Sequence, residues 1–230
     1  MVQLGVDEMS EAKELKARSQ ITSISELKAI TVHTKSVMSD ATALGVFGLS
    51  MVCFVASSQK LGWTEGTAYI IPWAIILGSF AQIWASIVDF KNNNYFGAIV
   101  LGAFGLFWSG VAFHWAIGLG WFGDVGAAAD PRQLAFAFIG YLIFSLFITV
   151  AAMEANKVFF AILLLIDVLF ISLALAMLGV NAELFSKLGA YSEFVIALLG
   201  FYACGAFFLN GFFGRTILSL GKPLGLIKKG

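Results

Sequence analysis

The chain has 230 residues with a formal net charge of zero, and 60% of them are hydrophobic while only 12% are charged. With a mean hydropathy of +0.90, this composition excludes an ordinary soluble domain, whose surface would leave too much apolar area in water, and the balanced charge gives no support to nucleic-acid binding. It predicts an integral membrane protein, and the long apolar runs favour helices over the short alternating strands of a barrel.

Residues 1–39 form a polar segment ahead of the first apolar run. Ser10 followed by Glu11 is typical of a helix start, and apolar residues recur among charged ones at spacings of three or more. We expect a partly helical cytoplasmic segment that either stays solvated or lies against the membrane or a neighbouring subunit. It is not expected to be a signal peptide, because it lacks a continuous apolar core and mixes acids with bases.

Six apolar stretches of about 20 residues follow, and this is the length that a helix needs to cross about 30 Å of hydrocarbon. They predict an all-α integral membrane protein with six transmembrane helices per subunit, in a transporter domain over residues 40–216 that is followed by a cytoplasmic tail over 217–230. The stretches cover residues 41–57, 67–88, 95–117, 133–153, 158–180 and 191–213.

The distribution of Lys and Arg predicts that both termini are cytoplasmic, in a multi-pass protein of the cell membrane. One side of the membrane is expected to hold Lys28, Lys35, Lys91, Lys157, Arg215, Lys222, Lys228 and Lys229. The loops on the other side are expected to hold only three cations, Lys60, Arg132 and Lys187, together with the acids Glu65, Asp124, Asp130, Glu183 and Glu193.

The polar side chains Gln82, Asp167 and Asn210 stand inside the predicted second, fifth and sixth spans. An unpaired amide or carboxyl in hydrocarbon is costly, so each is expected to face protein or a water-filled path. Asp167 lies among apolar residues with no cation one turn away, which favours its neutral acid form unless a partner or water reaches it. It is a candidate proton relay, with a structural hydrogen bond as the open alternative, whereas a helix-bridging role is favoured for the two amides alone.

Small residues inside the spans predict close helix packing. Ala98 and Gly102 stand four apart on one helix face, as do Gly200 and Cys204, and such pairs let neighbouring backbones approach. Cys53 and Cys204 both fall in spans and have no metal-ligand spacing, so neither a metal nor another cofactor is expected.

Four short motifs follow one another at fixed places in the chain. They cover residues 78–85 (Gly-Ser-Phe-Ala-Gln-Ile-Trp-Ala), 89–97 (Asp-Phe-Lys-Asn-Asn-Asn-Tyr-Phe-Gly), 105–108 (Gly-Leu-Phe-Trp) and 210–216 (Asn-Gly-Phe-Phe-Gly-Arg-Thr). In order and spacing, the chain from Asp40 to Gly221 thereby resembles the acetate uptake transporter family, the small acetate and succinate permeases of bacteria, archaea and fungi.

This resemblance implies a homo-oligomer, typically a hexamer, with a separate narrow path through each subunit. In the alignment to these motifs, an apolar constriction of the path would consist of Leu49, Phe104 and Ile166. A ring of apolar side chains of that kind excludes hydrated ions. The residues expected to line the path and bind substrate are Gln82, Trp84, Asn210, Thr42 and Leu44.

The first span begins differently from that of the family. Residues 40–46 read Asp-Ala-Thr-Ala-Leu-Gly-Val, where the family has Asn-Pro-Ala-Pro-Leu-Gly-Leu at the substrate entrance. The loss of both prolines changes how the helix begins, and an ionised Asp40 at the entrance would repel a carboxylate.

Three functions remain open from the sequence. The leading one is transport of acetate or a related small monocarboxylate, with succinate as a further substrate, in which the neutral acid passes the constriction with hydrogen bonds to amides such as Gln82. If Asp167 carries the proton the protein is a symporter, and if the solute is protonated on entry it is a channel-like facilitator. The alternatives are a channel for a small neutral solute such as ammonia or water, and a non-transporting membrane scaffold. An enzyme is not expected, because no nucleophile-base pair or phosphate-binding loop is present.

Overall fold

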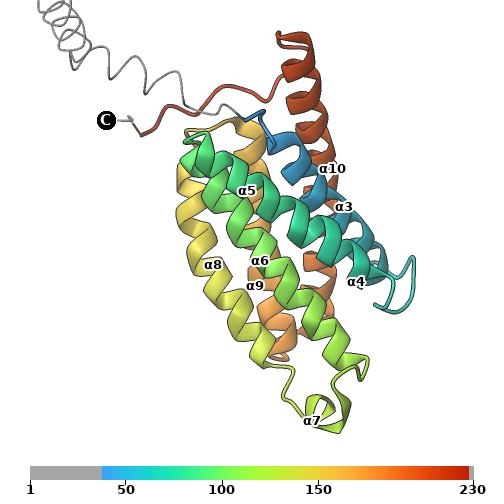
Figure 1. The fold of residues 1–230 in the computed structure, drawn as a ribbon. Helices are drawn as coiled ribbons and strands as arrows, with labels where there is room; N and C mark the ends of the chain where they lie inside the picture. The colour runs from blue at the N-terminus through green and yellow to red at the C-terminus, as the bar shows by residue number, and fades with distance from the viewer. Residues whose placement is uncertain (1–37, 228–230) are drawn as a thin grey trace, which may run out of the picture. The chain divides into compact units, whose positions relative to one another are not determined.

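The computed structural model describes residues 38–227 of the chain. The expectations for the N-terminal segment, and those for Lys28, Lys35, Lys228 and Lys229, therefore concern residues outside this range. Within it, six helices are long and apolar enough to cross a membrane, and the helical prediction is confirmed (Figure 1). The described residues contain no strand.

The helices follow one another in a simple order. They are α3 (Thr42–Lys60), α4 (Ile70–Trp73), the π-helical segment η1 (Ala74–Ala81), α5 (Gln82–Lys91), α6 (Tyr95–Gly118), the short α7 (Gly123–Ala127), α8 (Gln133–Ala152), α9 (Lys157–Met177) and α10 (Ala182–Phe213). The consecutive segments α4, η1 and α5 form one span, Ile70–Lys91, so the six spans are α3, this composite helix, α6, α8, α9 and α10.

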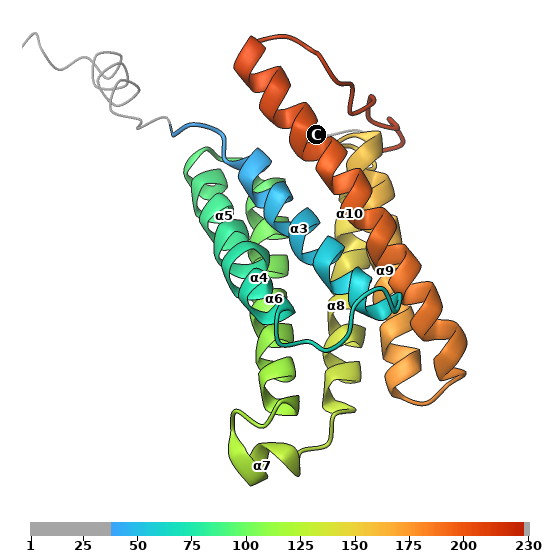
Figure 2. The same ribbon diagram turned by 90° about the vertical axis from the view of Figure 1, so that its right-hand side faces the viewer.

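The spans pack side by side as a bundle. Helix α10 lies along α3 and α9, α9 lies along α8, and η1 and α5 lie along α6 and α3 (Figures 1 and 2). We call the end of the bundle at which α3 begins and α10 ends the termini end, and the opposite end, which carries α7, the α7 end (Figure 2).

Small residues produce the closest helix contacts, as the sequence predicts. A Cβ atom at Gly48 of α3 would overlap the carbonyl oxygen of Leu77 in η1, and one at Gly200 of α10 would overlap the Ser50 hydroxyl. At Gly102 of α6 a Cβ would come within 2.8 Å of the Ser86 hydroxyl, which donates a hydrogen bond of 2.6 Å to the carbonyl of Ala98. Backbone contact of this kind holds helices together where lipid removes the hydrophobic drive.

The sixth span differs from its predicted bounds. It begins at Ala182 rather than at residue 191 and has 32 residues, about 48 Å of helix. The prediction stopped at the charged residues, but Glu183 and Lys187 pair across one helical turn at 2.6 Å, so they are accommodated in the helix. The expectation that Lys60 and Glu193 belong to loops is also wrong, because both lie within helices and pair with each other.

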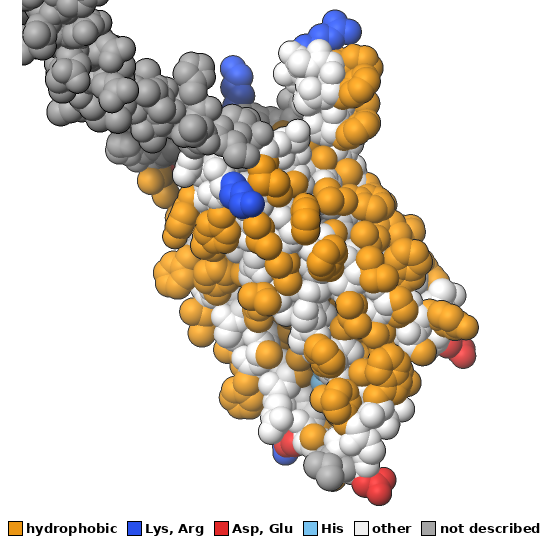
Figure 3. Space-filling model, in the orientation of Figure 1, with side chains coloured by type: hydrophobic (Ala, Val, Ile, Leu, Met, Phe, Trp, Pro, Cys, Tyr) orange, Lys and Arg blue, Asp and Glu red, His pale blue; other side chains and the backbone are white. Residues whose placement is uncertain are grey.

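The surface of the bundle suits a membrane. Large apolar side chains are exposed on every span, for example Phe54, Phe80, Leu106, Phe147, Leu164 and Phe208. They cover the middle of the molecule, while basic side chains gather toward the termini end and acidic ones toward the α7 end (Figure 3). Lipid can therefore solvate the middle of the bundle, with the charged ends in water.

The residues after α10 form a strap, residues 217–227, that returns to the turn between α8 and α9. Asn210 holds its start: the amide Nδ2 donates to the Leu218 carbonyl at 2.8 Å, and Oδ1 accepts from the amides of Ile217 at 2.6 Å and Leu218 at 3.0 Å. Farther on, the Leu224 amide donates to the carbonyl of Met153 at 2.7 Å. Asn210 thus fastens the strap to the last span.

Replacing Asn210 with alanine is expected to release this strap, because three hydrogen bonds of about 1 kcal/mol each are lost. Limited thermolysin digestion of the detergent-solubilised protein should then cleave within residues 217–227 about tenfold faster or more. Ser219→Ala removes one exposed hydrogen bond to the Gly221 amide and is the matched control, with cleavage near the wild-type rate. Equal cleavage of both variants would show that Asn210 does not hold the strap.

Candidate functional site

A narrow cavity lies among α3, α5, α6 and α9, nearer to the termini end. Its volume is about 30 Å³, enough for one or two water molecules. The structure brings Leu49, Phe104 and Ile166 together in its wall, from three different helices, and adds Thr42 and Gln82. The other lining residues are Val46, Phe96, Gly97, Val100, Leu101, Phe159, Ile162 and Leu163, so no described residue places a charge on this cavity.

Gln82 is the main polar group of the narrow cavity. The side chain is fully buried, and its amide Nε2 donates a hydrogen bond of 2.6 Å to the carbonyl of Gly78, one turn earlier. The reverse orientation would set two oxygens against each other, so this bond fixes which way the amide points. The carbonyl Oε1 has no hydrogen-bond partner among the described residues. Gln82 therefore brings one buried, unsatisfied acceptor to the wall of a cavity whose exposed lining is apolar.

The backbone around Gln82 is unusual. It is the first residue of α5, directly after eight residues of π-helix. Such wide turns interrupt the regular pairing of an α-helix and are frequent at functional sites. Here the π-helical segment ends at the residue whose buried amide stands in the wall of the cavity.

A layer of aromatic rings closes the narrow cavity on the side of the α7 end. The ring of Phe170 lies 6.2 Å from that of Phe104 and 5.1 Å from that of Phe107, measured between centroids. Phe104 lines the narrow cavity, whereas Phe107 lines a second, larger one. Three residues of helix span about 4.5 Å, so the two cavities are separated by little more than this layer.

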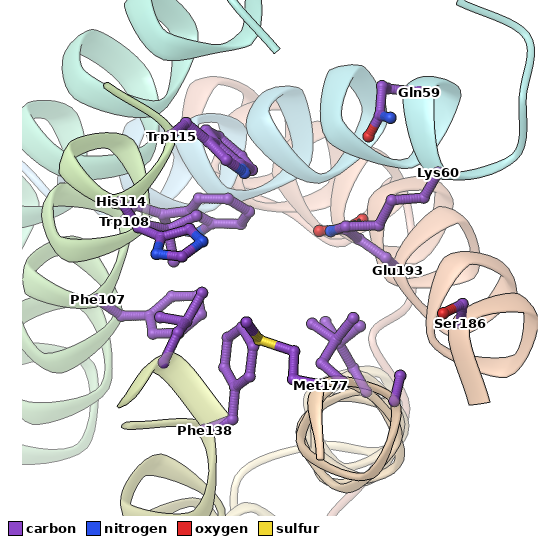
Figure 4. Close-up of a pocket in the computed structure, with 15 residues that line it drawn as sticks. Gln59, Lys60, Phe107, Trp108, His114, Trp115, Phe138, Met177, Ser186 and Glu193 are labelled. Atoms are coloured by element: carbon purple, nitrogen blue, oxygen red, sulfur yellow. Dashed lines mark hydrogen bonds and ion pairs between the residues drawn. The ribbon is translucent and has the colours of Figure 1, made fainter. Parts of the chain in front are cut away.

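The larger cavity has a volume of about 380 Å³ and lies toward the α7 end (Figure 4). One wall comes from α6, which contributes Phe107, Trp108, His114 and Trp115, and the other walls come from α3, α8, α9 and α10. Those walls carry Gln59, Lys60, Leu134, Phe138, Leu169, Leu173, Ala176, Met177, Ser186 and Glu193, with Val111 also from α6.

An ion pair stands in the wall of the larger cavity. Lys60 Nζ lies 2.7 Å from Glu193 Oε2, and the two side chains meet across the space from His114 (Figure 4). The lysine side chain is 23% exposed and the glutamate side chain only 1%, so the lysine is the more accessible partner of the pair. By contrast, the pairs Arg132–Asp130 and Lys187–Glu183 lie on the surface, where such contacts add little stability.

Sequence reasoning missed this pair because Lys60 stands at the end of an apolar stretch and Glu193 near the start of another. Each looks like a loop charge when its helix is considered alone. The available signal was the position of Glu193 three residues inside the predicted sixth span, where an acid needs a partner.

Besides Asp167, four of the predicted site residues lie away from both cavities. Leu44 and Trp84 are 45% and 52% exposed and face outward. Asn210 holds the strap. Asp40 is exposed, and its Oδ1 accepts a hydrogen bond of 2.8 Å from the amide of Thr42, so it satisfies a free amide in the first turn of α3.

Asp167 faces α8 rather than either cavity. Its Oδ2 accepts a hydrogen bond of 2.7 Å from the hydroxyl of Thr149, and the residue is only 7% exposed. Oδ1 has no hydrogen-bond partner within the described part of the chain. This geometry favours the structural alternative, a bond between α8 and α9, over a place on the path.

Asp167→Asn is accordingly expected to leave the proton dependence of any transport within about twofold of wild type, because the amide can still accept the bond from Thr149. Asp167→Leu should instead lower the thermal stability, because it leaves a buried hydroxyl without its partner, at about 1–3 kcal/mol. Proton-driven uptake and the unfolding temperature of both variants check this. Loss of proton-driven uptake in well-folded Asp167→Asn would restore the proton-relay role.

The comparisons with known proteins agree on one family. The sequence profile of the GPR1/FUN34/yaaH family matches residues 25–216. The chain is 25% identical over 187 residues to the succinate-acetate/proton symporter SatP of Escherichia coli K12, covering 80% of this chain and 96% of that protein. It is 30% identical over 141 residues to ammonia transport outward protein 2 of Saccharomyces cerevisiae, covering 58% of this chain and 49% of that protein.

A solved structure is similar as well. The bacterial acetate channel SatP matches with a TM-score of 0.73 at 23% identity, over 80% of this chain and 99% of that one. At this identity the match establishes the shared fold of six spanning helices.

Proposed function

Because the chain belongs to the GPR1/FUN34/yaaH family, we propose that it carries acetate or a related small monocarboxylate across a membrane. The solute moves along one path inside each subunit, from the larger cavity through the aromatic layer to the narrow cavity. The observation that carries this proposal is Gln82 Oε1, a buried acceptor without a hydrogen-bond partner among the described residues, in the wall of an otherwise apolar constriction.

The chemistry of the constriction favours the neutral acid over the anion. A carboxylate has only acceptor atoms and would meet the Gln82 carbonyl as a second acceptor, after losing its water in an apolar space. The protonated acid carries one O–H donor, which can pair with that carbonyl. A hydrogen bond to this carbonyl therefore forms only with the neutral acid, so that each carboxylate that crosses in this way takes one proton with it.

The constriction is closed in the described conformation. A cavity with room for only one or two water molecules is too small for a two-carbon acid. Passage requires rotation of side chains such as Leu49, Phe104 and Ile166, which have no polar bonds to break. Such an apolar gate excludes hydrated ions while it opens for a small neutral molecule.

A second solute deserves a direct comparison in the same experiment. An apolar constriction with one acceptor also suits ammonia, a small neutral donor, and a yeast relative is named for ammonia transport. We favour carboxylate transport because the similarity to the SatP symporter extends over most of both chains. The similarity to the yeast ammonia transport protein covers only about half of that protein's length.

Two further features belong to this proposal. We place both termini on the cytoplasmic side of the cell membrane, since Lys91 ends a span, Lys157 begins one, and Arg215 and Lys222 follow the last one, all at the termini end. We also propose a homo-oligomer, a hexamer by family resemblance, which native mass spectrometry in detergent would detect.

The experiment is uptake of radiolabelled acetate into proteoliposomes at pH 8, where little free acid crosses the lipid unaided. Liposomes without protein give the remaining leak. Protein-dependent uptake that excess propionate inhibits is the expected result. Uptake of methylammonium without acetate uptake would favour the ammonia channel, and no flux of either in a folded oligomer would favour a scaffold.

A further inference from the structure

We propose that the Lys60–Glu193 pair is a receptor for the carboxylate of the transported acid, and that it takes up one proton with each carboxylate it binds. This inference rests on the proposed function, because it assigns the step at which the solute leaves water. The pair lines the larger cavity, and the apolar residues Phe107, Phe138 and Leu169 line the same space. It is thus the charged group that an anion meets before the aromatic layer.

The two partners differ in how they face the cavity. Glu193 is almost fully buried, whereas Lys60 is partly exposed (Figure 4). Lys60 is the last residue of α3, and its ammonium group stands at the end of a flexible four-carbon side chain. An incoming anion can therefore reach the ammonium group of Lys60 without first displacing the Glu193 carboxylate from it. A substrate carboxylate and the Glu193 carboxylate are chemically equivalent partners for it.

Competition between these two carboxylates links binding to a proton. If both stayed ionised, two negative charges would share one ammonium in a partly desolvated wall, and their repulsion would oppose binding. Protonation of Glu193 removes that repulsion and leaves Lys60 to the substrate. One proton is therefore taken up for each anion bound, and by linkage the affinity falls about tenfold per pH unit above neutrality.

The same pair can then return the proton. The Glu193 carboxyl O–H bond breaks as a new O–H bond forms on the substrate, so that a carboxylate and a carboxylic acid become a carboxylic acid and a carboxylate. The two acids are alike, so the transfer has little intrinsic cost. The regenerated Glu193 anion pairs again with Lys60, and the neutral acid is free to enter the constriction.

Few other titratable groups face Glu193. From α3 come Lys60 itself and the buried Cys53, which does not line the cavity, and from α6 comes His114 on the opposite wall. Helix α9 contributes only apolar side chains there. Glu193 is therefore the carboxyl group among the described residues that line the cavity. His114 is the other group whose titration could cause a pH dependence, so a control must exclude it.

The receptor also defines a substrate class. One lysine in the cavity lining matches one carboxylate, and a second carboxylate of the same solute would find no lysine or arginine among the described lining residues. Acids with one carboxylate and a short apolar remainder fit both the pair and the apolar walls. Dicarboxylates are expected to bind more weakly than monocarboxylates of similar size.

The test is binding of radiolabelled acetate to the purified full chain in detergent, by scintillation proximity between pH 6.5 and 8.5. Wild type should lose affinity about tenfold per pH unit. In Glu193→Gln the amide carries no proton to exchange, so acetate should bind with an affinity that changes less than twofold over the range. Its acetate flux in proteoliposomes should fall at least tenfold, since the proton donor is missing.

Matched controls separate this site from other charges. Glu183→Gln alters an exposed ion pair on the same helix, and His114→Asn alters the opposite wall; both should keep the wild-type pH slope. A wild-type slope in Glu193→Gln, or loss of the slope in His114→Asn alone, would overturn the proposal even while wild type transports acetate. Absence of wild-type flux would instead overturn the proposed function itself.

A double variant guards against misfolding. Lys60→Met alone leaves the buried Glu193 carboxylate without its partner. Lys60→Met combined with Glu193→Gln removes both charges, so that no buried charge is left unpaired. The double variant should elute as the wild-type oligomer and bind acetate at least tenfold more weakly at pH 7. Unchanged binding in this variant would place the carboxylate elsewhere.

Discussion

Gln82→Leu is expected to lower protein-dependent acetate flux between about tenfold and a hundredfold. Leucine has a similar size, so the wall of the narrow cavity is preserved while its free acceptor is lost. A neutral acid that crosses would then leave its O–H donor without a partner, which costs about 1–3 kcal/mol. Initial rates of uptake into proteoliposomes measure the effect.

The control for this variant is Ser86→Ala, one turn further along α5. Ser86 is also buried and donates a hydrogen bond of 2.6 Å to the carbonyl of Ala98, but it does not line the narrow cavity. It should keep most of the flux although it loses a buried bond. Similar rates in both variants would mean that Gln82 is only a structural bridge between turns.

Gly48→Ala is expected to give the largest loss of stability. Its methyl group would overlap the carbonyl oxygen of Leu77, and because that atom belongs to the backbone of η1, no side-chain rotation relieves the clash. Overpacking of this kind costs up to about 3 kcal/mol or more. In a chain of this length this corresponds to a fall of about 6–12 °C in the unfolding temperature.

Gly110→Ala in α6 is the matched control. This glycine is also helical, but a Cβ there would meet no atom within 4 Å. Alanine forms helices better than glycine, so the unfolding temperature should stay the same or rise slightly. Equal stability of the two variants would contradict the close contact between α3 and η1.

The fold could be predicted from the sequence to a large extent, because a membrane span has a fixed length and a strong apolar signal. The bounds at Tyr95 and Gln133 are those that the structure shows, and the resemblance inferred from the four motifs is confirmed by the family match. The start of α10 could not be predicted, since an i,i+4 ion pair hides polar residues inside a helix. The π-helical segment before Gln82 could not be predicted either, because no pattern of apolar residues distinguishes it from an α-helix.

The candidate site was harder to predict than the fold. Leu49, Phe104 and Ile166 line one cavity, as the motif alignment placed them, and Gln82 joins them. Their roles in transport stay predictions. Trp84 and Leu44 lie outside because a motif match does not tell which face of a span looks inward. Lys60 and Glu193 were overlooked because their pairing joins residues 133 positions apart.

The central claim is that the acid crosses as a neutral molecule, and one measurement tests it most directly. Initial acetate uptake into proteoliposomes is followed from pH 6 to pH 8 with the concentration of free acetic acid held constant, so that the anion rises tenfold per pH unit. The account predicts a protein-dependent rate that stays constant within about twofold. A rate that rises in proportion to the anion would contradict it and identify the protein as an anion channel.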